Sequence, residues 1–178
     1  MENAIEYWDL LDEWRQPTGE IHIRGQIVPS GRNHVVVHLC VFNLQGQLLI
    51  QQRQSFKQGW SNLWDITVGG SIQAGENSRE GITRETFEEL GLSLDFQYTQ
   101  ALFTVKGPDY FDDYYIVQAQ PPLESLVLQA SEVQDVAWAD WEMILRLHRE
   151  NKFIPYSLNL LAYLFELGTG KARQSFLV

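Results

Sequence analysis

The chain has 178 residues, of which 44% are hydrophobic, and a formal net charge of -10. This length suits a single globular domain with its own core, and we find no linker, internal repeat or low-complexity segment that would divide it. The charge argues against a nucleic-acid polymer as partner, because phosphates would be repelled where no basic stripe is present. It leaves open a phosphate ligand that is contacted through metal ions.

Three further features favour the cytoplasm. The longest apolar runs are too short or too interrupted to span a bilayer, so no membrane partner is expected. The N-terminal residues are acidic and lack the basic start and apolar stretch of a secretion signal. Cys40, the one cysteine, has no partner for an internal disulfide.

Alternating apolar residues and turn signals predict a strand-rich chain with one central helix and two C-terminal helices. This pattern indicates an α/β or α+β layered domain. The predicted strands are an N-terminal hairpin within 6–24 that turns at 16–19, a second hairpin from 34–43 and 47–53, and further strands at 64–68, 98–105, 113–119 and 134–138. The predicted helices are 78–90, 141–150 and 156–167.

The central helix has clear end signals. Asn77 can cap its first turn, Glu80 can complete a reciprocal capping box, and Gly91 sits where a left-handed residue usually ends a helix. Ile82, Thr86 and Leu90 recur at helical spacing and are expected to face the sheet, with Phe87 beside them.

Glu85, Glu88 and Glu89 lie three and four residues apart, so a helix places them on one face. These carboxylates repel one another, and their position near the helix C-terminus adds about 0.3–1 kcal/mol of unfavourable energy per charge. A hard divalent cation removes the conflict, since Mg²⁺ and Mn²⁺ prefer oxygen ligands. Taken alone, the same three residues also fit a solvated acidic face.

The surrounding residues decide between these two interpretations. The segment 70–92 resembles the Nudix box, in which a glycine, a glutamate, an arginine, three further glutamates, a second glycine and an aliphatic residue recur at fixed spacing. The matching residues here are Gly70, Glu76, Arg84, Glu85, Glu88, Glu89, Gly91 and Leu92. The one departure is Thr86, where the family usually has an aliphatic residue.

The resemblance implies a Nudix-type α/β/α sandwich with a central mixed sheet, formed by a single domain over 1–178. It also implies that the helix glutamates and the carbonyl of Gly69 bind Mg²⁺ or Mn²⁺, and that a water made acidic by the metals attacks phosphorus. The catalytic residues that follow are Glu85, Glu88, Arg84 and Glu132, and the metal ligands are Glu85, Glu88, Glu89 and Gly69. Among these, Glu85 or Glu88 is the favoured base, Glu132 is a more distant candidate base, and Arg84 pairs with Glu76 to orient the helix.

Features outside the box resemble the subgroup related to isopentenyl-diphosphate isomerase. They include Trp8 to Glu13, His34, His38 and Trp64-Asp65. At the positions of that isomerase's cysteine and nearby histidine, however, this chain has Gly69 and Ser71. The acid–base pair for isomerisation is therefore incomplete, which favours hydrolysis.

Substrate contacts are assigned to Arg53, Lys57, Tyr110 and Phe111. The first two flank the metal-binding segment in sequence, although solvated surface charges fit them equally. The aromatic pair belongs to the segment 106–113, which combines turn residues with aromatics expected to be exposed. His34 and His38 are about 13 Å apart in a strand, so they cannot chelate one ion together, and we interpret them as hydrogen-bonded histidines at the edge of a core strand.

The sequence therefore predicts a metal-dependent hydrolase that cleaves the diphosphate linkage of a nucleoside diphosphate joined to a further group, or of a similar small molecule. The alternatives are an isopentenyl-diphosphate-isomerase-like enzyme and a non-catalytic nucleotide sensor. A homodimer is left open, because the N-terminal hairpin and the C-terminal helices are both available as interfaces.

Overall fold

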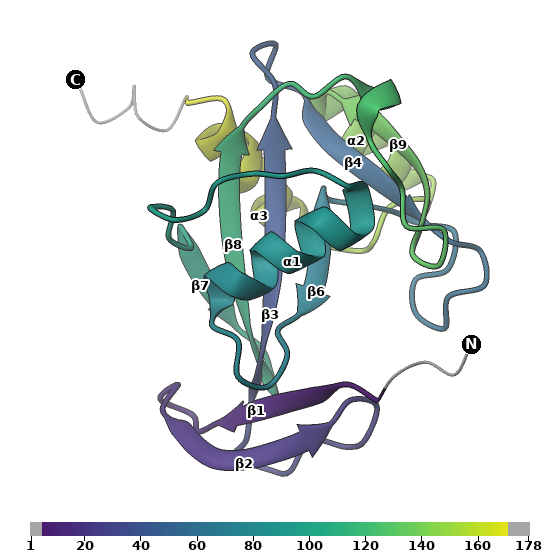
Figure 1. The fold of residues 1–178 in the computed structure, drawn as a ribbon. Helices are drawn as coiled ribbons and strands as arrows, with labels where there is room; N and C mark the ends of the chain where they lie inside the picture. The colour runs from purple at the N-terminus through teal and green to yellow at the C-terminus, as the bar shows by residue number, and fades with distance from the viewer. Residues whose placement is uncertain (1–4, 171–178) are drawn as a thin grey trace. The chain divides into compact units, whose positions relative to one another are not determined.

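The computed structural model describes residues 5–170, in which strands dominate and three α-helices follow the predicted order (Figure 1). The predicted domain limits of 1–178 extend beyond these residues. The helices are α1 (Ser78–Leu90), α2 (Trp141–Arg149) and α3 (Leu158–Gly168), with a short 3₁₀ turn at Leu123–Ser125. The strands are β1 (Tyr7–Leu11), β2 (Pro17–Ile23), β3 (His34–Phe42), β4 (Leu48–Arg53), β5 (Trp64–Asp65), β6 (Val68–Ser71), β7 (Phe103–Lys106), β8 (Tyr110–Gln118) and β9 (Val133–Ala139).

The strands form two sheets. β1 and β2 pair antiparallel in a hairpin of their own. The larger sheet has the order β5-β4-β3-β8-β7, with β6 paired to β3 and β9 paired to β4. A central sheet with three helices confirms the predicted α/β class.

The chain divides into two compact units. The first comprises Met1–His38, Gly69–Glu85 and Asp95–Tyr115, and the second comprises Leu39–Val68, Thr86–Leu94 and Ile116–Val178. β3, α1 and β8 each contribute residues to both units, so α1 begins in one and ends in the other.

In the first unit, hydrogen bonds tie the N-terminal hairpin to the segment that precedes α1. The amide of Ala74 donates to the carbonyl of Tyr7 at 2.8 Å, and the amide of Gly75 donates to the Asp9 carboxylate at 2.7 Å. The Trp8 ring stacks on His34 with centroids 3.8 Å apart. The segment that leads into α1 therefore rests on the hairpin.

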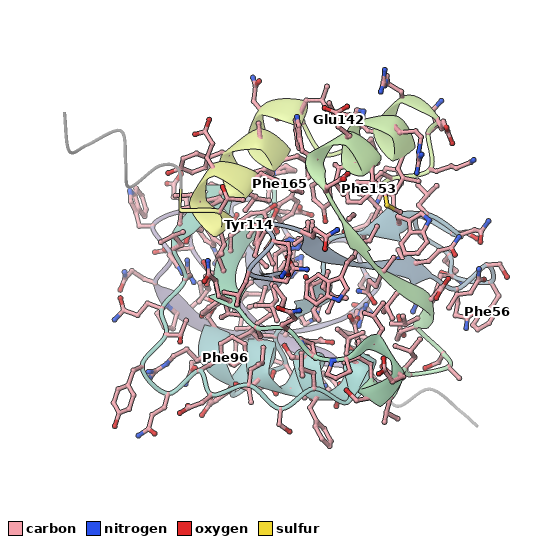
Figure 2. The ribbon with its side chains drawn as sticks, turned by 90° about the horizontal axis from the view of Figure 1, so that it is seen from above. Phe56, Phe96, Tyr114, Glu142, Phe153 and Phe165 are labelled. Atoms are coloured by element: carbon pink, nitrogen blue, oxygen red, sulfur yellow. The ribbon has the colours of Figure 1, made fainter. Side chains whose placement is uncertain are left out.

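In the second unit, β4 pairs with β9 along most of its length, from Leu48 opposite Ala139 to Arg53 opposite Val133. α3 covers this part of the core through Phe165, whose ring meets Phe42 edge-on at a centroid separation of 5.2 Å (Figure 2). Both C-terminal helices start with side-chain caps: Asp140 accepts from the amide of Met143, and Ser157 accepts from the amide of Leu160.

Four expectations about local structure were wrong. The first hairpin turns at Asp12–Gln16, earlier than expected, because the Asp12 carboxylate accepts the amides of Trp14 and Gln16. The strand predicted at 64–68 is two strands, broken where the Asp65 carboxylate accepts the amide of Ile66. The strand predicted at 98–105 starts only at Phe103. Phe87 is 60% exposed instead of facing the sheet.

The rest of the apolar pattern on α1 is confirmed. Ile82, Thr86 and Leu90 are fully buried. Among the described residues, no helix has the length and apolar character needed to cross a bilayer.

We expect Gly168→Ala to destabilise the second unit. A methyl group at Gly168 would overlap the ring of Phe42, which is fully buried and cannot swing into solvent. Overpacking of this kind costs about 1–3 kcal/mol, and a urea titration followed by circular dichroism measures it. Gly59→Ala is the matched control, since a methyl group there meets nothing within 4 Å. Equal midpoints for the two variants would show that the contact is not tight.

Candidate active site

α1 is held at both ends by the predicted caps. The Asn77 side-chain oxygen accepts the amides of Arg79 and Glu80 at 3.0 and 3.1 Å, and the Glu80 carboxylate accepts the amide of Asn77 at 2.8 Å. Gly91 ends the helix with φ of 62°, in the left-handed region. These caps satisfy backbone groups that a helix leaves without internal partners, so the ends of the glutamate-bearing helix are well defined.

An ion pair inside the first unit confirms the predicted partnership of Arg84 and Glu76. The Arg84 Nε and Nη2 atoms donate to the two Glu76 carboxylate oxygens at 2.7 and 2.9 Å. Burial opposes ionisation of Glu76, but the bonds from Arg84 and from the Gln73 amide prevail and hold the pKa of Glu76 below its usual value. Arg84 also donates to the carbonyl of Ser71 at 3.2 Å, which fixes α1 to the end of β6.

The carboxylate of Glu85 lies against the backbone of Gly70. A side chain at position 70 would overlap all three atoms of that carboxyl group, so only glycine allows the approach. Arg84 Nη1 contacts Glu85 Oε1 at 3.0 Å. The Glu85 side chain is only 13% exposed, and its carboxyl group is thus held beside the half-buried backbone of Gly70.

Glu88 and Glu89 belong to the second unit. Glu89 is buried, with 4% exposure, and accepts a hydrogen bond from the Gln51 side-chain amide at 2.8 Å. Glu88 is exposed. The helix spacing keeps both on the face that carries Glu85.

The side chains and carbonyl predicted as metal ligands all offer oxygen atoms, which hard divalent cations prefer. Glu85, Glu88 and Glu89 offer carboxylate oxygens from two turns of one helix, and Gly69 offers a backbone carbonyl. Within residues 5–170, no group of three His, Cys, Asp or Glu side chains converges as a preformed metal cage. Glu85 and Gly69 belong to the first unit, and Glu88 and Glu89 belong to the second.

Lys57 and Glu132 meet in the second unit. The Lys57 ammonium lies 2.6 Å from Glu132 Oε1, and the Gln54 amide donates to the carbonyl of Glu132 at 2.9 Å. Arg53 donates from Nε to the carbonyl of Gly59 at 3.2 Å. A predicted substrate-binding residue is therefore ion-paired with a predicted base. The roles of all three side chains stay predictions.

Residues 107–109 form a tight turn between β7 and β8, with the amide of Gly107 donating to the carbonyl of Tyr110 at 2.9 Å, and residues 110–113 of the predicted loop belong to β8 instead. Phe111 is buried, with 6% exposure, and the cationic groups of Arg15 and Lys106 lie over its ring. The expectation of exposed aromatic surface is wrong for Phe111. Tyr110 is half-buried, and the substrate roles of both residues stay predictions.

The two histidines of β3 have different surroundings within the first unit. His38 Nε2 lies 3.2 Å from Asp112, and its ring stacks on Tyr114 at 4.7 Å. His34 stacks on Trp8 and its Nδ1 has no hydrogen-bond partner among the described residues. Desolvation holds the pKa of His34 below its usual value. The interpretation as hydrogen-bonded histidines of a core strand therefore fits the Nε2 contact of His38, while His34 is packed mainly through its ring.

Two sets of polar contacts were missed. Gln51 binds Glu89 from a strand that reads as ordinary core. Arg15 pairs with the buried Asp113, and Ser78 and Thr104 donate to the same carboxylate. No local sequence pattern could have predicted the Arg15–Asp113 contact, because the two residues are 98 positions apart.

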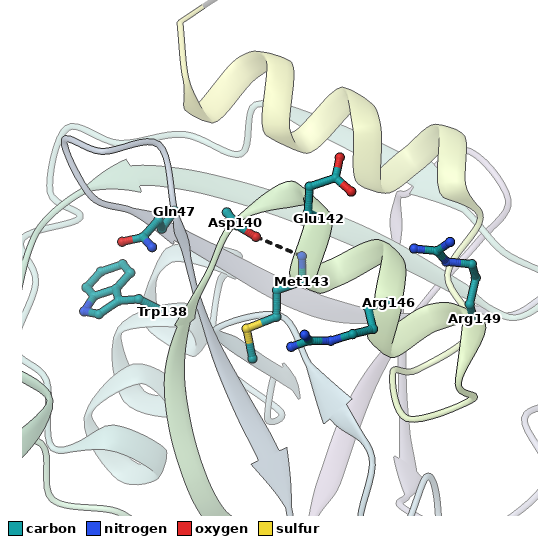
Figure 3. A pocket seen from close by; sticks show the side chains of 7 residues that line it. All are labelled: Gln47, Trp138, Asp140, Glu142, Met143, Arg146 and Arg149. Atoms are coloured by element: carbon teal, nitrogen blue, oxygen red, sulfur yellow. Dashed lines mark hydrogen bonds between the residues drawn. The ribbon is translucent and has the colours of Figure 1, made fainter.

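A separate hollow of about 450 Å³ opens in the second unit around α2 (Figure 3). Its lining mixes two arginines with two carboxylates and contains none of the predicted site residues. The residues are Gln47, Trp138, Asp140, Glu142, Met143, Arg146 and Arg149.

Comparison with known proteins decides the family. The NUDIX domain model matches residues 32–160. The chain belongs to the Nudix hydrolase family. An uncharacterized Nudix hydrolase of Listeria innocua is 45% identical over 163 residues, which cover 92% of this chain and 95% of that protein. An isopentenyl-diphosphate Delta-isomerase of Citrobacter koseri is 28% identical over 146 residues, covering 79% and 81%.

The fold comparison agrees. The DR0079 protein of Deinococcus radiodurans superposes with a TM-score of 0.70 at 22% identity, over 89% of this chain and 97% of that one. The predicted Nudix box, the likeness to the isomerase and the assignment to an enzyme family are thereby confirmed.

We expect Cys40 to be unreactive in the native protein. The thiol is fully buried, and desolvation, with a smaller contribution from Asp65, raises its pKa far above the usual value. Ellman's reagent should detect no thiol in native protein and one per chain in denaturant. Fast reaction of native protein would show that β3 opens readily.

We expect the Glu76–Arg84 pair to stabilise the fold in a pH-dependent way. Because the folded pKa of Glu76 is depressed, the contribution is present above the usual carboxyl pKa of about 4.3 and is lost as pH falls through the folded pKa. Glu76→Gln should lower the free energy of unfolding by about 1–3 kcal/mol at pH 7. The difference from wild type should shrink in acid. Glu124→Gln, which changes an exposed carboxylate, should show no such difference at either pH.

Proposed function

We propose that this Nudix hydrolase cleaves the diphosphate linkage of a nucleoside diphosphate joined to a further group, or of a similar small diphosphate, with Mg²⁺ or Mn²⁺ as cofactor. The observation that carries the proposal is the approach of Glu85 to Gly70, on a helix whose other glutamates are all present. A carboxylate held against a glycine backbone offers oxygen ligands to a cation that also binds phosphate oxygens.

The residues have distinct tasks in this proposal. A divalent cation bound there would neutralise charge on the phosphates and acidify a water molecule. Arg84, braced by Glu76, fixes the orientation of α1 and of the neighbouring Glu85. Gln51 donates to one oxygen of Glu89 at 2.8 Å and so orients that carboxylate.

The proton of the attacking water needs an acceptor. Glu85 and Glu88 are our candidates, since they share the helix face that binds the metal. Glu132 is a second candidate, supported by its place in a turn with an ammonium partner, Lys57. That partner also competes for the lone pairs that would accept the proton.

An isomerase-like activity is the alternative that the Citrobacter koseri relative suggests. Protonating an isoprenoid double bond needs an acid and a base on opposite sides of the substrate. Gly69 and Ser71 stand where that enzyme class has ionisable side chains, and Cys40 is fully buried in β3. The residues present thus favour hydrolysis.

We further propose that the partner is a small molecule, with no nucleic-acid polymer or membrane involved, and that the enzyme acts in the cytoplasm. The net charge of -10 supports the first point. Whether two copies associate through the N-terminal hairpin or the C-terminal helices is a question for light scattering.

We expect phosphate or nucleoside monophosphate release from one class in a panel of diphosphates in the presence of Mg²⁺ or Mn²⁺. The panel contains nucleoside triphosphates, ADP-ribose, dinucleotides, coenzyme A and isoprenoid diphosphates. Chelation should abolish release. Glu85→Gln, Glu88→Gln or Glu89→Gln should each lower kcat, by about 10²–10⁴-fold where a base is lost.

Glu142→Gln is the matched control, because it neutralises an exposed carboxylate on α2, outside the Nudix box (Figure 2). Full activity of this control excludes a general effect of lost charge. Tight binding of one compound without turnover would contradict hydrolysis and favour the sensor. Rearrangement of isopentenyl diphosphate without release of phosphate would favour the isomerase.

A further inference from the structure

We infer that Arg15, Asp113 and Ser78, here called the positioning relay, fix the position of the first turn of α1. Through the helix they also fix the position of Glu85. Arg15 lies in the turn of the N-terminal hairpin, outside the residues 32–160 that match the family model. The inference rests on the metal-dependent function proposed above and assigns the hairpin a part in it.

Asp113 is the centre of the relay. Its side chain is 1% exposed, yet four hydrogen bonds reach its two oxygens. Arg15 donates from both terminal nitrogens, with the Nη1 to Oδ1 distance at 2.7 Å, and Thr104 and Ser78 each donate at 2.6 Å. Burial opposes ionisation of Asp113, but these donors prevail and lower its pKa. The carboxylate is therefore charged, saturated and fixed in place.

Ser78 connects this centre to the helix. It is the first residue of α1, and its hydroxyl also lies 2.8 Å from the Tyr115 hydroxyl. Asn77 caps the N-terminus of the helix, so the Ser78 hydroxyl is not needed to accept a backbone amide there. Glu85 follows seven residues later, about 10 Å along the helix axis. A helix moves as a stiff rod over two turns, so a shift at Ser78 is passed on to Glu85.

A buried ion pair is weak evidence of a gain in stability, because desolvation of both charges offsets their attraction. The Arg15–Asp113 pair instead fixes the orientation of both side chains, because a bidentate guanidinium–carboxylate contact has a defined geometry. Arg15 is also held in the left-handed region, with φ of 64°. A non-glycine residue in this region is strained, and the strain is consistent with a turn that holds the Arg15 side chain in one orientation.

The relay borders a hollow of about 490 Å³ in the same unit. Arg15 retains 35% exposure. If its side chain were removed, the space in front of Asp113 would therefore be open to a small cation. Its lining includes the three relay residues together with Asn77, Thr104 and Tyr115.

The test compares Arg15→Ala and Ser78→Ala with wild type in two measurements on the full chain. The first is the affinity for Mn²⁺ alone, from electron paramagnetic resonance, which needs no substrate. The second is hydrogen exchange of the α1 amides, which needs no metal. Ser78→Ala keeps good helix propensity, so a lost helix cannot explain its effect.

Arg32→Ala is the matched control. Arg32 also makes a two-pronged pair, through Nε and Nη2 to Glu20, in the same unit but on the surface. We expect both relay variants to bind Mn²⁺ about tenfold more weakly, as is usual when a group that orients a metal ligand is removed. Exchange at 78–85 should be faster in both, and the control should match wild type.

Chemical rescue separates positioning from general loss of stability. Millimolar guanidinium should restore Mn²⁺ affinity to Arg15→Ala but not to Ser78→Ala, and equal urea should restore neither. Unchanged exchange at 78–85 in both variants would overturn the relay. Absence of Mn²⁺ binding by wild type would instead contradict the proposed function, while the exchange data would still decide whether Arg15 and Ser78 hold the helix.

Discussion

The contact between the Glu85 carboxylate and the Gly70 backbone is the constraint on which the candidate site depends. It demands glycine at position 70, because any side chain would occupy the volume of the carboxyl group. It also demands a cation nearby, since a carboxylate of low exposure next to further glutamates on one helix is costly to ionise. Arg84 meets that demand by contacting Glu85 on one side and Glu76 on the other.

The same electrostatic problem is solved differently at Glu89. There the Gln51 side-chain amide donates to one oxygen of the buried carboxylate at 2.8 Å, which fixes the direction of that oxygen. α1 therefore carries one glutamate, Glu85, that contacts an arginine and another, Glu89, that contacts an amide.

Local chemistry explains which parts of this arrangement could be predicted. The caps of α1 and its buried stripe follow from residues within a few positions of one another, and Asn77, Glu80 and Gly91 lie where predicted. The prediction that Phe87 faces the sheet was wrong because burial depends on the position around the helix as well as on hydrophobicity. Phe87 lies about 100° around the helix from the buried Thr86, on the same side as the exposed Thr83. The prediction of one continuous strand at 64–68 was wrong because the amide of Ile66 donates to the Asp65 side chain instead of to a neighbouring strand.

Contacts between distant residues were the part that no pattern could supply. Asp112 and Asp113 end the segment 106–113 that the sequence assigns to turn residues, but they are neighbours on β8, and adjacent strand residues point to opposite faces. One therefore meets His38 and the other meets Arg15. Alternation becomes informative only once the strand is known to begin at Tyr110. A chain with a net charge of -10 that buries aspartates in this way must assign each its own partner, and for Asp113 that partner comes from the hairpin that precedes the family's shared core.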